Sequence, residues 1–306
     1  MLTSILLVIV LIMVVSGIYF LPVSRVPCNT LYAAVPEEIR QSLQGFRRRH
    51  ALRQVQVDGV DWHYINVGEG ETTILFLHGM AGGYDIWWQQ IEALRQHYRV
   101  IALTYPPVHS LADLTRGIIA ILKQEGVVGF NVVGSSLGGY LAQYLVAGLP
   151  VRIQKAVFAN TFPPNDIIVQ KTRISGKLLP FLPEWVVMWN LRKTTTKAIY
   201  PASGRNELVA AYLMEQSHGM MRKAQFVSRF HCILDYFQPA DQEASNVEIM
   251  LIEANNDPLV EKTLREMIKT TYPSARIKTL PGAGHFPYLN RPEEYTGILE
   301  EFFNGN

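Results

Sequence analysis

The sequence has 306 residues, of which 48% are hydrophobic and 18% are charged, below the ~25% charged residues of an average soluble domain. This composition excludes intrinsic disorder and a coiled coil, and the length is sufficient to bury a large core. The net charge of +2 gives no support for a nucleic-acid-binding surface, and the two cysteines cannot form a disulfide framework or a zinc-spaced cluster.

The first 23 residues contain no charged side chain, and residues 5–15 are almost all Ile, Leu, Val or Met. The apolar run of residues 2–23 is long enough, at 1.5 Å per residue, to cross a ~30 Å hydrocarbon layer. Tyr19 and Phe20 lie near its end, where interfacial aromatic residues are expected, and Pro22 then ends the helix. We therefore expect residues 1–23 to form a transmembrane anchor. The alternative is a cleaved signal peptide with a weak cleavage site at residues 15–17, although such a peptide begins with Lys or Arg and has a shorter apolar core.

Residues 24–50 are interpreted as a juxtamembrane linker with a short helix over residues 37–46. The basic run at residues 47–50 is expected to lie on a solvated face, with contact to anionic lipid headgroups as the alternative. Arg25 and Arg40 follow the apolar run, whereas no basic side chain precedes it. The positive-inside rule therefore places the rest of the chain in the cytoplasm.

Two short β-runs then flank Asp58 and Gly59, the favoured residues of a two-residue hairpin turn. Continuous apolar runs, which are typical of strands buried on both faces of a parallel sheet, occur at residues 73–77, 99–104, 130–133, 156–159, 247–252 and 276–280. Helical patterns alternate with them at residues 87–96, 111–124, 137–147, 259–271 and 292–303. An antiparallel start followed by strand–helix repeats predicts one doubly wound α/β domain over residues 51–306.

Residues 163–239 contain helical patterns without any strand pattern, and they separate two of the predicted strands. We expect them to form a helical cap over the carboxyl edge of the sheet, where such folds bind ligands. Apolar residues are dense in one part of this cap, and we expect most of them to be cap core and some to line a pocket that favours a lipophilic acyl substrate: Leu178, Leu179, Phe181, Leu182, Trp185, Val186, Val187, Met188 and Trp189.

The motif with the clearest chemistry is Gly-Ser-Ser-Leu-Gly at residues 134–138, a G-x-S-x-G pattern between a predicted strand and a predicted helix. In that context the serine occupies a tight, strained turn, and the glycines on either side let neighbouring backbone pass without steric clash. Ser136 is therefore the predicted nucleophile, with Gly134 and Gly138 supporting the turn. The alternative is that Ser136 only caps the helix, as Ser135 also could.

A second glycine-rich loop, His78-Gly79-Met80 and the residues up to 83, follows the predicted strand 73–77. It allows the Met80 N–H to turn inward and pair with the Leu137 N–H as an oxyanion hole. We expect His78 to orient this loop by hydrogen bonding rather than to take part in catalysis.

His285 lies on a glycine-flanked loop after the last predicted strand, and Asp257 follows the predicted strand 247–252. A histidine on such a loop is expected to reach the serine, with Asp257 holding the imidazole. Asp257 followed by Pro258 is also typical of a helix N-terminus, and both roles are compatible because a carboxylate has two oxygens. The order Ser136, Asp257, His285 is that of the α/β-hydrolases.

Over residues 53–303 the chain resembles the α/β-hydrolase superfamily and, within it, the maspardin branch. The second resemblance is carried by residues 98–106, 138–143, 272–276 and 286–289. It implies the α/β-hydrolase fold, and it implies for maspardin itself an adaptor-like role, because that family has Asn where the catalytic His is expected. This sequence departs from that pattern by retaining His285 and the complete loop after His78.

Two classes of function follow. The first is a membrane-anchored serine hydrolase that acts on an ester or related acyl bond and needs no metal or organic cofactor. The second is a catalytically silent, maspardin-like binding or scaffold protein. A serine nucleophile argues against epoxide hydrolases and haloalkane dehalogenases, whereas C–C hydrolases, haloperoxidases and peptidases share the same residues and stay open.

Overall fold

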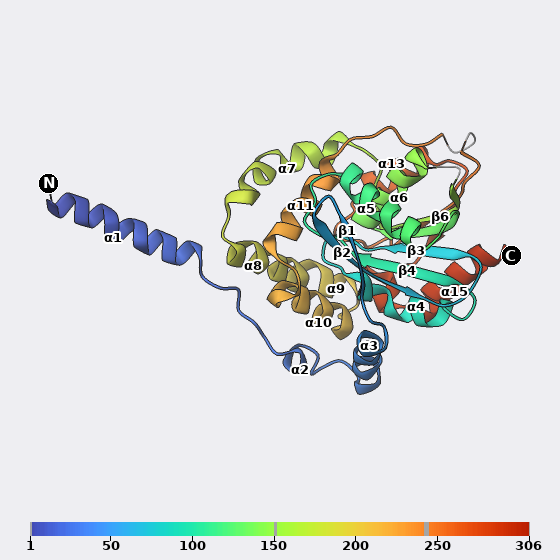
Figure 1. The fold of residues 1–306 in the computed structure, drawn as a ribbon, viewed down its shortest axis with the longest axis horizontal. Coiled ribbons are helices and arrows are strands. Elements are labelled where there is room, and N and C mark those ends of the chain that lie inside the picture. Colours follow the sequence, from blue (N-terminus) through green and yellow to red (C-terminus); the bar gives the residue numbers. More distant parts are fainter. Residues whose placement is uncertain (1, 150–151, 242–244, 306) are drawn as a thin grey trace.

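The computed structural model describes residues 2–149, 152–241 and 245–305. Its centre is a sheet of eight strands in the described part of the chain, in the order β1-β2-β4-β3-β5-β6-β7-β8 (Figure 1). Strand β2 pairs antiparallel with both β1 and β4, and all the other neighbouring strands pair parallel. The strands are Arg53–Val57, Val60–Val67, Thr73–Leu77, Arg99–Thr104, Phe130–Ser135, Ile153–Ala159, Glu248–Glu253 and Arg276–Thr279. The predicted antiparallel start and parallel remainder are thus confirmed.

Helices cover both faces of this sheet, and each face has its own buried apolar cluster. Strands β3 and β5 are buried along their whole length, which explains why their sequences are continuously apolar. The helices that flank the sheet are α4 (Trp88–Leu94), α5 (Leu111–Gln124), α6 (Leu137–Gly148), α13 (Lys262–Thr271), α14 (Pro287–Asn290) and α15 (Pro292–Asn304). Helix α13 begins three residues later than predicted, because the segment before it folds into a turn around Asp257.

Between β6 and β7 the described chain is helical and forms the cap. Its segments are α7 (Asp166–Leu178), η3 (Leu179–Phe181), α8 (Glu184–Thr194), η4 (Thr195–Ile199), α9 (Tyr200–Ala202), α10 (Glu207–Glu215), η5 (Gln216–Met220) and α11 (Lys223–Leu234).

The expectation that the apolar residues of the cap are mostly core is wrong. Of those nine residues, only Val187 and Met188 are buried, whereas Phe181 is 74% and Trp189 52% exposed, and Leu178 and Leu182 are exposed as well. The reason is their position, since α7, η3 and α8 lie at the outer edge of the molecule and pack against the rest on one side only (Figure 1).

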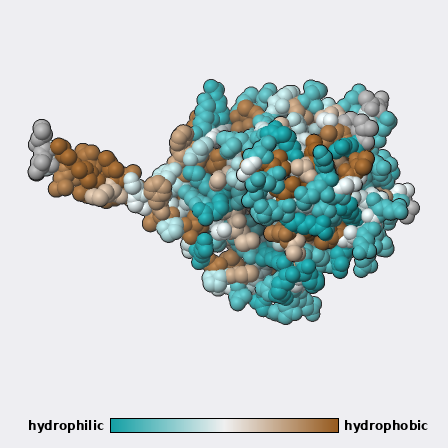
Figure 2. Space-filling model, in the orientation of Figure 1, coloured by the Kyte–Doolittle hydropathy of each residue, from teal (hydrophilic) through white to brown (hydrophobic). Residues whose placement is uncertain are grey.

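The N-terminal helix α1 (Leu2–Tyr19) projects from the domain as an apolar rod (Figure 2). It is shorter than the predicted run of residues 2–23: the chain leaves the helix after Tyr19 and passes through Pro22, which has no N–H for a helical bond. None of the helices in the described ranges is long and apolar enough to cross a membrane. The prediction of a transmembrane helix over residues 1–23 is therefore not supported.

Two short helices follow, α2 (Cys28–Leu31) and α3 (Glu37–Arg49), the second starting at the predicted residue and ending three residues later. The interpretation of the basic run as a solvated face is wrong for Arg47. Its guanidinium is bound by the carboxylates of Asp85, at 2.7 Å, and Glu215, at 2.8 Å. Asp85 belongs to the segment η1 (Tyr84–Trp87) of the core and Glu215 to cap helix α10, so Arg47 joins three parts of the chain.

Candidate active site

Ser136 occupies the turn between β5 and α6 with φ 56° and ψ −121°, a left-handed conformation that is strained for a residue with a side chain. Three hydrogen bonds hold it there: its N–H donates to the carbonyl of Ala159 at 2.9 Å, and its carbonyl accepts from Thr161 Oγ1 at 2.7 Å and from the Tyr140 N–H at 2.9 Å. The side chain is only partly buried. The predicted nucleophile turn therefore has the backbone geometry that its sequence indicates.

The glycines of the motif are needed because backbone passes very close to them. A Cβ on Gly134 would lie 2.1 Å from the carbonyl oxygen of Gly138, and a Cβ on Gly138 would lie 2.0 Å from that of Leu77. Neither position accepts a larger residue, so the turn packs directly against the end of β3.

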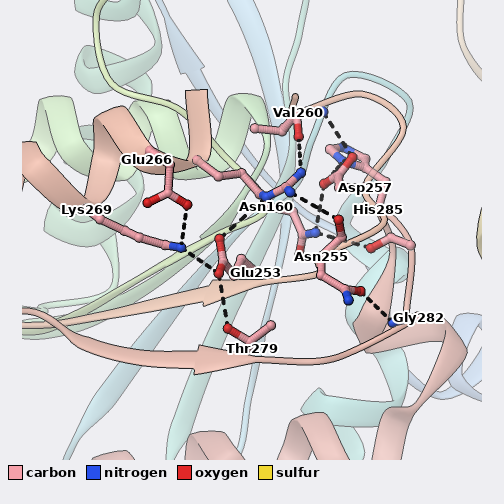
Figure 3. Close-up of polar contacts among 12 residues, drawn as sticks. Asn160, Glu253, Asn255, Asp257, Val260, Glu266, Lys269, Thr279, Gly282 and His285 are labelled. Carbon is pink, nitrogen blue, oxygen red and sulfur yellow. Dashed lines mark hydrogen bonds and ion pairs between the residues drawn. The ribbon is translucent and has the colours of Figure 1, made fainter. Parts of the chain in front are cut away.

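His285 and Asp257 meet at the carboxyl edge of the same sheet, on the loops after β8 and β7 (Figure 3). His285 Nδ1 lies 2.8 Å from Asp257 Oδ2 and 3.0 Å from Oδ1, and the histidine is 2% exposed. Because a carboxylate can only accept, Nδ1 carries the ring proton and Nε2 is left as the free acceptor. No hydrogen bond joins His285 to Ser136 in the described part of the chain.

The carboxylate of Asp257 is divided between two tasks. Oδ1 accepts from the backbone N–H groups of Leu259 and Val260, at 2.8 and 3.0 Å, and Oδ2 accepts from His285 and from Asn160 Nδ2 at 2.8 Å. Burial alone would raise the pKa of Asp257, but the charge and hydrogen bond of His285 and the other donors lower it below its ordinary value. The group is therefore ionised at neutral pH.

The two loops are also tied to each other. The side-chain oxygens of Asn255 and Asn256 accept from the N–H groups of Gly282 and Gly284, each at 2.9 Å. Arg265 of α13 donates to the carbonyl oxygens of Asn255 and Val260. Asn256 Nδ2 also donates to the carbonyl of Ala202 in cap segment α9 at 2.7 Å, so the Asp257–His285 pair is held mainly by the core domain, with a contact to the cap.

The loop after β3 lies against the nucleophile turn, as predicted. A Cβ on Gly79 would lie 3.7 Å from Ser136 Oγ. His78 is buried within this loop: Nε2 accepts from the N–H of Tyr105 at 3.2 Å, so Nδ1 carries the proton and donates to the Gly79 carbonyl at 2.7 Å. Burial and then the charge of Arg229 lower the pKa of His78 well below its usual value, so the ring is neutral.

This neutral histidine acts on the peptide group that carries the Met80 N–H. The Gly79 carbonyl and the Met80 N–H belong to one peptide unit, and a donor on its oxygen polarises its N–H. The Met80 N–H and the N–H of Leu137, the first residue of α6, both belong to backbone beside Ser136. The structure therefore gives His78 the orienting contact that the sequence suggested.

Two residues of this region were not found from the sequence. Asn160 follows β6 directly, at the same edge of the sheet as Asp257, and this position after a strand was the available signal. Arg229 of α11 reaches the loop from the cap by donating to the Met80 carbonyl at 2.7 Å, and its sequence context gave no signal.

Two features define the α/β-hydrolase class. One is the sheet with the strand order described above, and the other is a serine on a strained strand-to-helix turn at the edge where the loops after three other strands also lie. The comparison with known families agrees: residues 74–297 match the model described as "Alpha/beta hydrolase family", and the chain belongs to that family.

Among curated proteins the chain is similar to "Maspardin" of Danio rerio, with 27% identity over 272 residues that cover 84% of this chain and 85% of the relative. The resemblance to maspardin is thereby confirmed. Among solved structures it is similar to a hydrolase from Pseudomonas aeruginosa PA01, with a TM-score of 0.71, 21% identity and coverage of 82% of this chain and 98% of the other. A structure described as "a membrane phospholipase A, a novel bacterial virulence factor" matches with a TM-score of 0.64 and 18% identity, covering 100% of this chain and 99% of the other. At these identities the solved structures support the fold, and together with the family they indicate a hydrolase.

Proposed function

We propose that this chain is a serine hydrolase that cleaves an ester or a related acyl bond with Ser136 as nucleophile, His285 as general base and Asp257 as its partner. The observation that carries the proposal is the buried His285–Asp257 pair, whose hydrogen bond through Nδ1 leaves Nε2 as the acceptor. A pair of this kind is built to accept a proton from a neighbouring hydroxyl.

In this mechanism the Ser136 hydroxyl attacks the substrate carbonyl carbon while His285 Nε2 accepts its proton. The N–H groups of Met80 and Leu137 bind the oxyanion of the tetrahedral intermediate, each contributing about 3 kcal/mol in the transition state. His285 then gives the proton to the leaving alcohol, which leaves an acyl ester on Ser136. A water molecule activated by the same imidazole hydrolyses that ester, and Asp257 stays ionised throughout.

The missing hydrogen bond between Ser136 and His285 is compatible with this proposal, because such contacts are often long without substrate and shorten in the complex. Both residues lie at one edge of the sheet, and Ser136 is partly exposed.

For the substrate we propose a lipophilic acyl ester presented at a membrane. Helix α1 is uncharged and its large side chains from Ile5 to Val15 are exposed, as are Ile174, Leu178, Phe181 and Trp189 on the outer face of the cap. Lys177 and Lys193 lie among these cap residues, where they fit anionic headgroups. The membrane phospholipase A, which matches this chain along its whole length including α1, supports the same substrate class.

Helix α1 is also fixed to the cap. Trp185 Nε1 of α8 donates to the carbonyl of Ile18 at 2.9 Å, and the Lys223 ammonium lies 5.8 Å from the ring centroid of Tyr19. These contacts hold the last turn of α1 beside the cap, which supports contact of the apolar helix and the apolar outer face of the cap with one lipid surface.

Flotation with vesicles tests this part. The full chain is expected to float with vesicles that contain anionic lipid, and a chain lacking residues 1–23 is expected to float weakly and to lose the remainder when Phe181 and Trp189 are changed to Ser. Equal flotation of all three proteins would contradict the membrane proposal. That the domain lies on the cytoplasmic side stays a prediction, and protease protection in sealed vesicles tests it.

The second candidate function is a catalytically silent scaffold, and the similarity to maspardin is the observation that supports it. Hydrolysis of p-nitrophenyl esters with acyl chains of 2 to 16 carbons separates the two functions. The serine hydrolase is expected to turn over medium or long chains faster than acetate, and Ser136→Ala is expected to abolish turnover. A folded wild-type protein that hydrolyses none of these esters would favour the scaffold.

A further inference from the structure

Arg229 is a buried cation that the proposed chemistry does not use. It lies in cap helix α11 and is only 1% exposed. In the described part of the chain it forms no ion pair with a carboxylate. Instead it donates to three backbone carbonyls outside the cap: Met80 at 2.7 Å, Gly82 at 3.1 Å and Tyr105 at 3.3 Å.

Burying a guanidinium in this way is costly unless its N–H groups are satisfied. Burial lowers the pKa of Arg229 to about 10, so the group keeps its positive charge at neutral pH. A cap residue that served only to attach the cap to the core would avoid this cost by being apolar. The charge is therefore directed at particular groups, two carbonyls of the loop after β3 and the carbonyl of Tyr105 directly after β4.

Those three carbonyls lie on two segments of the chain around the proposed oxyanion hole. Met80 and Gly82 lie on the glycine-rich loop itself, and the guanidinium binds the carbonyl of the residue whose N–H is the proposed oxyanion donor. Tyr105 is the residue whose N–H donates to His78, which in turn donates to the Gly79 carbonyl. Arg229 thus contacts the loop directly and also through the residue that orients its histidine.

We propose that Arg229 is a positioning residue for the oxyanion hole: from the cap, it holds the loop of residues 79–82 so that the Met80 N–H points at the oxyanion. The inference rests on the proposed serine hydrolase function. It means that the cap is part of the catalytic arrangement, since displacement of α11 removes the support of the loop.

The test compares wild type with Arg229→Met, Arg229→Lys and the matched control Arg222→Met. Arg222 is the N-cap residue directly before the same helix, but it is exposed and paired with Glu184 on the surface. With a p-nitrophenyl ester, Arg229→Met is expected to lower kcat on the order of 10²-fold, the loss typical of one oxyanion-hole donor, with KM changed less than about threefold. Arg229→Lys retains a cation that reaches some of the carbonyls, so its loss is expected to be about tenfold, and Arg222→Met is expected to match wild type.

A purely structural role is distinguished by an alkyl trifluoromethyl ketone, which forms an oxyanionic hemiketal with the serine. If Arg229 positions the oxyanion hole, the affinity for this inhibitor falls by the same factor as kcat. A lower melting temperature with unchanged kcat and unchanged ketone affinity in the folded protein would overturn the proposal.

Hydrogen–deuterium exchange of residues 78–83 separates this inference from the proposed function. Faster exchange in both Arg229 variants, but not in Arg222→Met, supports the proposal that Arg229 holds the loop of residues 79–82. This result stands even if the wild type hydrolyses no ester, and in that case the proposed function alone fails. If the wild type is active but Arg229→Lys changes neither the exchange of the loop nor kcat, the proposed role of Arg229 is overturned and the proposed function is not. If Arg229→Met does not fold, Arg229→Lys provides the same two readouts.

Discussion

The proposed acid–base pair and the loop of the proposed oxyanion hole depend to different degrees on the core and on the cap. His285 and Asp257 are held mainly by the core: Asn160, which follows β6, binds Asp257 (Figure 3). Asn255 and Asn256 bind the neighbouring loop and Arg265 comes from α13, although Asn256 also donates to the carbonyl of Ala202 in the cap. The loop with Met80 is oriented by His78 and is held in addition from the cap by Arg229.

The segment after that loop depends on the cap and on the N-terminal helices as well. Asp85 accepts from Tyr212 of α10 at 2.6 Å and from Arg47 of α3 at 2.7 Å, and Arg47 also binds Glu215 of the cap. In the proposed mechanism, the groups of proton transfer are therefore held mainly by the core, whereas the loop of the proposed oxyanion hole has a direct contact to the cap through Arg229. Changes in the two regions should therefore have different consequences.

The largest effect is expected from Ser136 and the proposed acid–base pair. Ser136→Ala and His285→Ala should each lower kcat on the order of 10⁶-fold, and the double variant little further, because the residues act as a unit. Asp257→Ala should lose on the order of 10⁴-fold. Steady-state kinetics with a medium-chain ester measures this, and Ser135→Ala, with its neighbouring hydroxyl, is the control that should keep most activity. Additive losses in the double variant would contradict a joint mechanism.

The same division explains what the sequence could predict. Ser136, Gly134 and Gly138 form a local motif, and Asp257 and His285 follow β-runs, so the folding of one parallel sheet brings them to a common edge. Contacts that depend on the seating of a helical insertion carry no such pattern, as for Arg229, which is 149 residues away from Met80.

The N-terminal part shows the same limit. Runs of apolar residues predicted helix α1 but not where it ends, and residue type alone suggested that Arg47 is solvated. Its burial follows from two carboxylates, Asp85 and Glu215, that lie far away in the sequence.

On the cap side, Arg47→Met should lower the free energy of unfolding by about 3 kcal/mol, because it leaves two buried carboxylates without their partner. Equilibrium unfolding in guanidinium chloride measures this loss of unfolding free energy. Arg49→Met in the same helix is the matched control, since Arg49 forms an exposed pair with Glu92 and should cost at most about 1 kcal/mol. Equal destabilisation by the two changes would show that Arg47 does not join the three parts.

A smaller effect is expected at Asn160. Asn160→Ala removes one hydrogen bond to the Asp257 carboxylate and should lower kcat about tenfold, corresponding to ~1.4 kcal/mol for a bond to a charged group. The KM of the ester should change little. The ratio of the affinity for the trifluoromethyl ketone to kcat should also change little. A loss that appears only in KM would contradict a role through Asp257.

The smallest effect concerns pH. Burial alone would raise the pKa of Glu215, but Arg47 lowers it below its ordinary value, as His285 does for Asp257. A depressed carboxyl pKa stabilises the fold above the unfolded value of ~4 and loses that contribution as the pH falls through the folded value. The stability of wild type should therefore fall below pH ~4, and the difference between wild type and Arg47→Met should shrink there. Unfolding curves at pH 7, 5 and 3 check this, and a constant difference would count against it.

The central claim is that His285 and Asp257 activate Ser136, and the site of covalent labelling tests it most directly. Wild type, Ser136→Ala, Ser135→Ala and His285→Ala are treated with an alkyl fluorophosphonate, and the adduct is located by peptide mass spectrometry. A single adduct is expected on Ser136 in wild type and Ser135→Ala, none in Ser136→Ala, and strongly slowed labelling in His285→Ala. A folded wild type without an adduct, or an adduct on another residue that persists in Ser136→Ala, would contradict it.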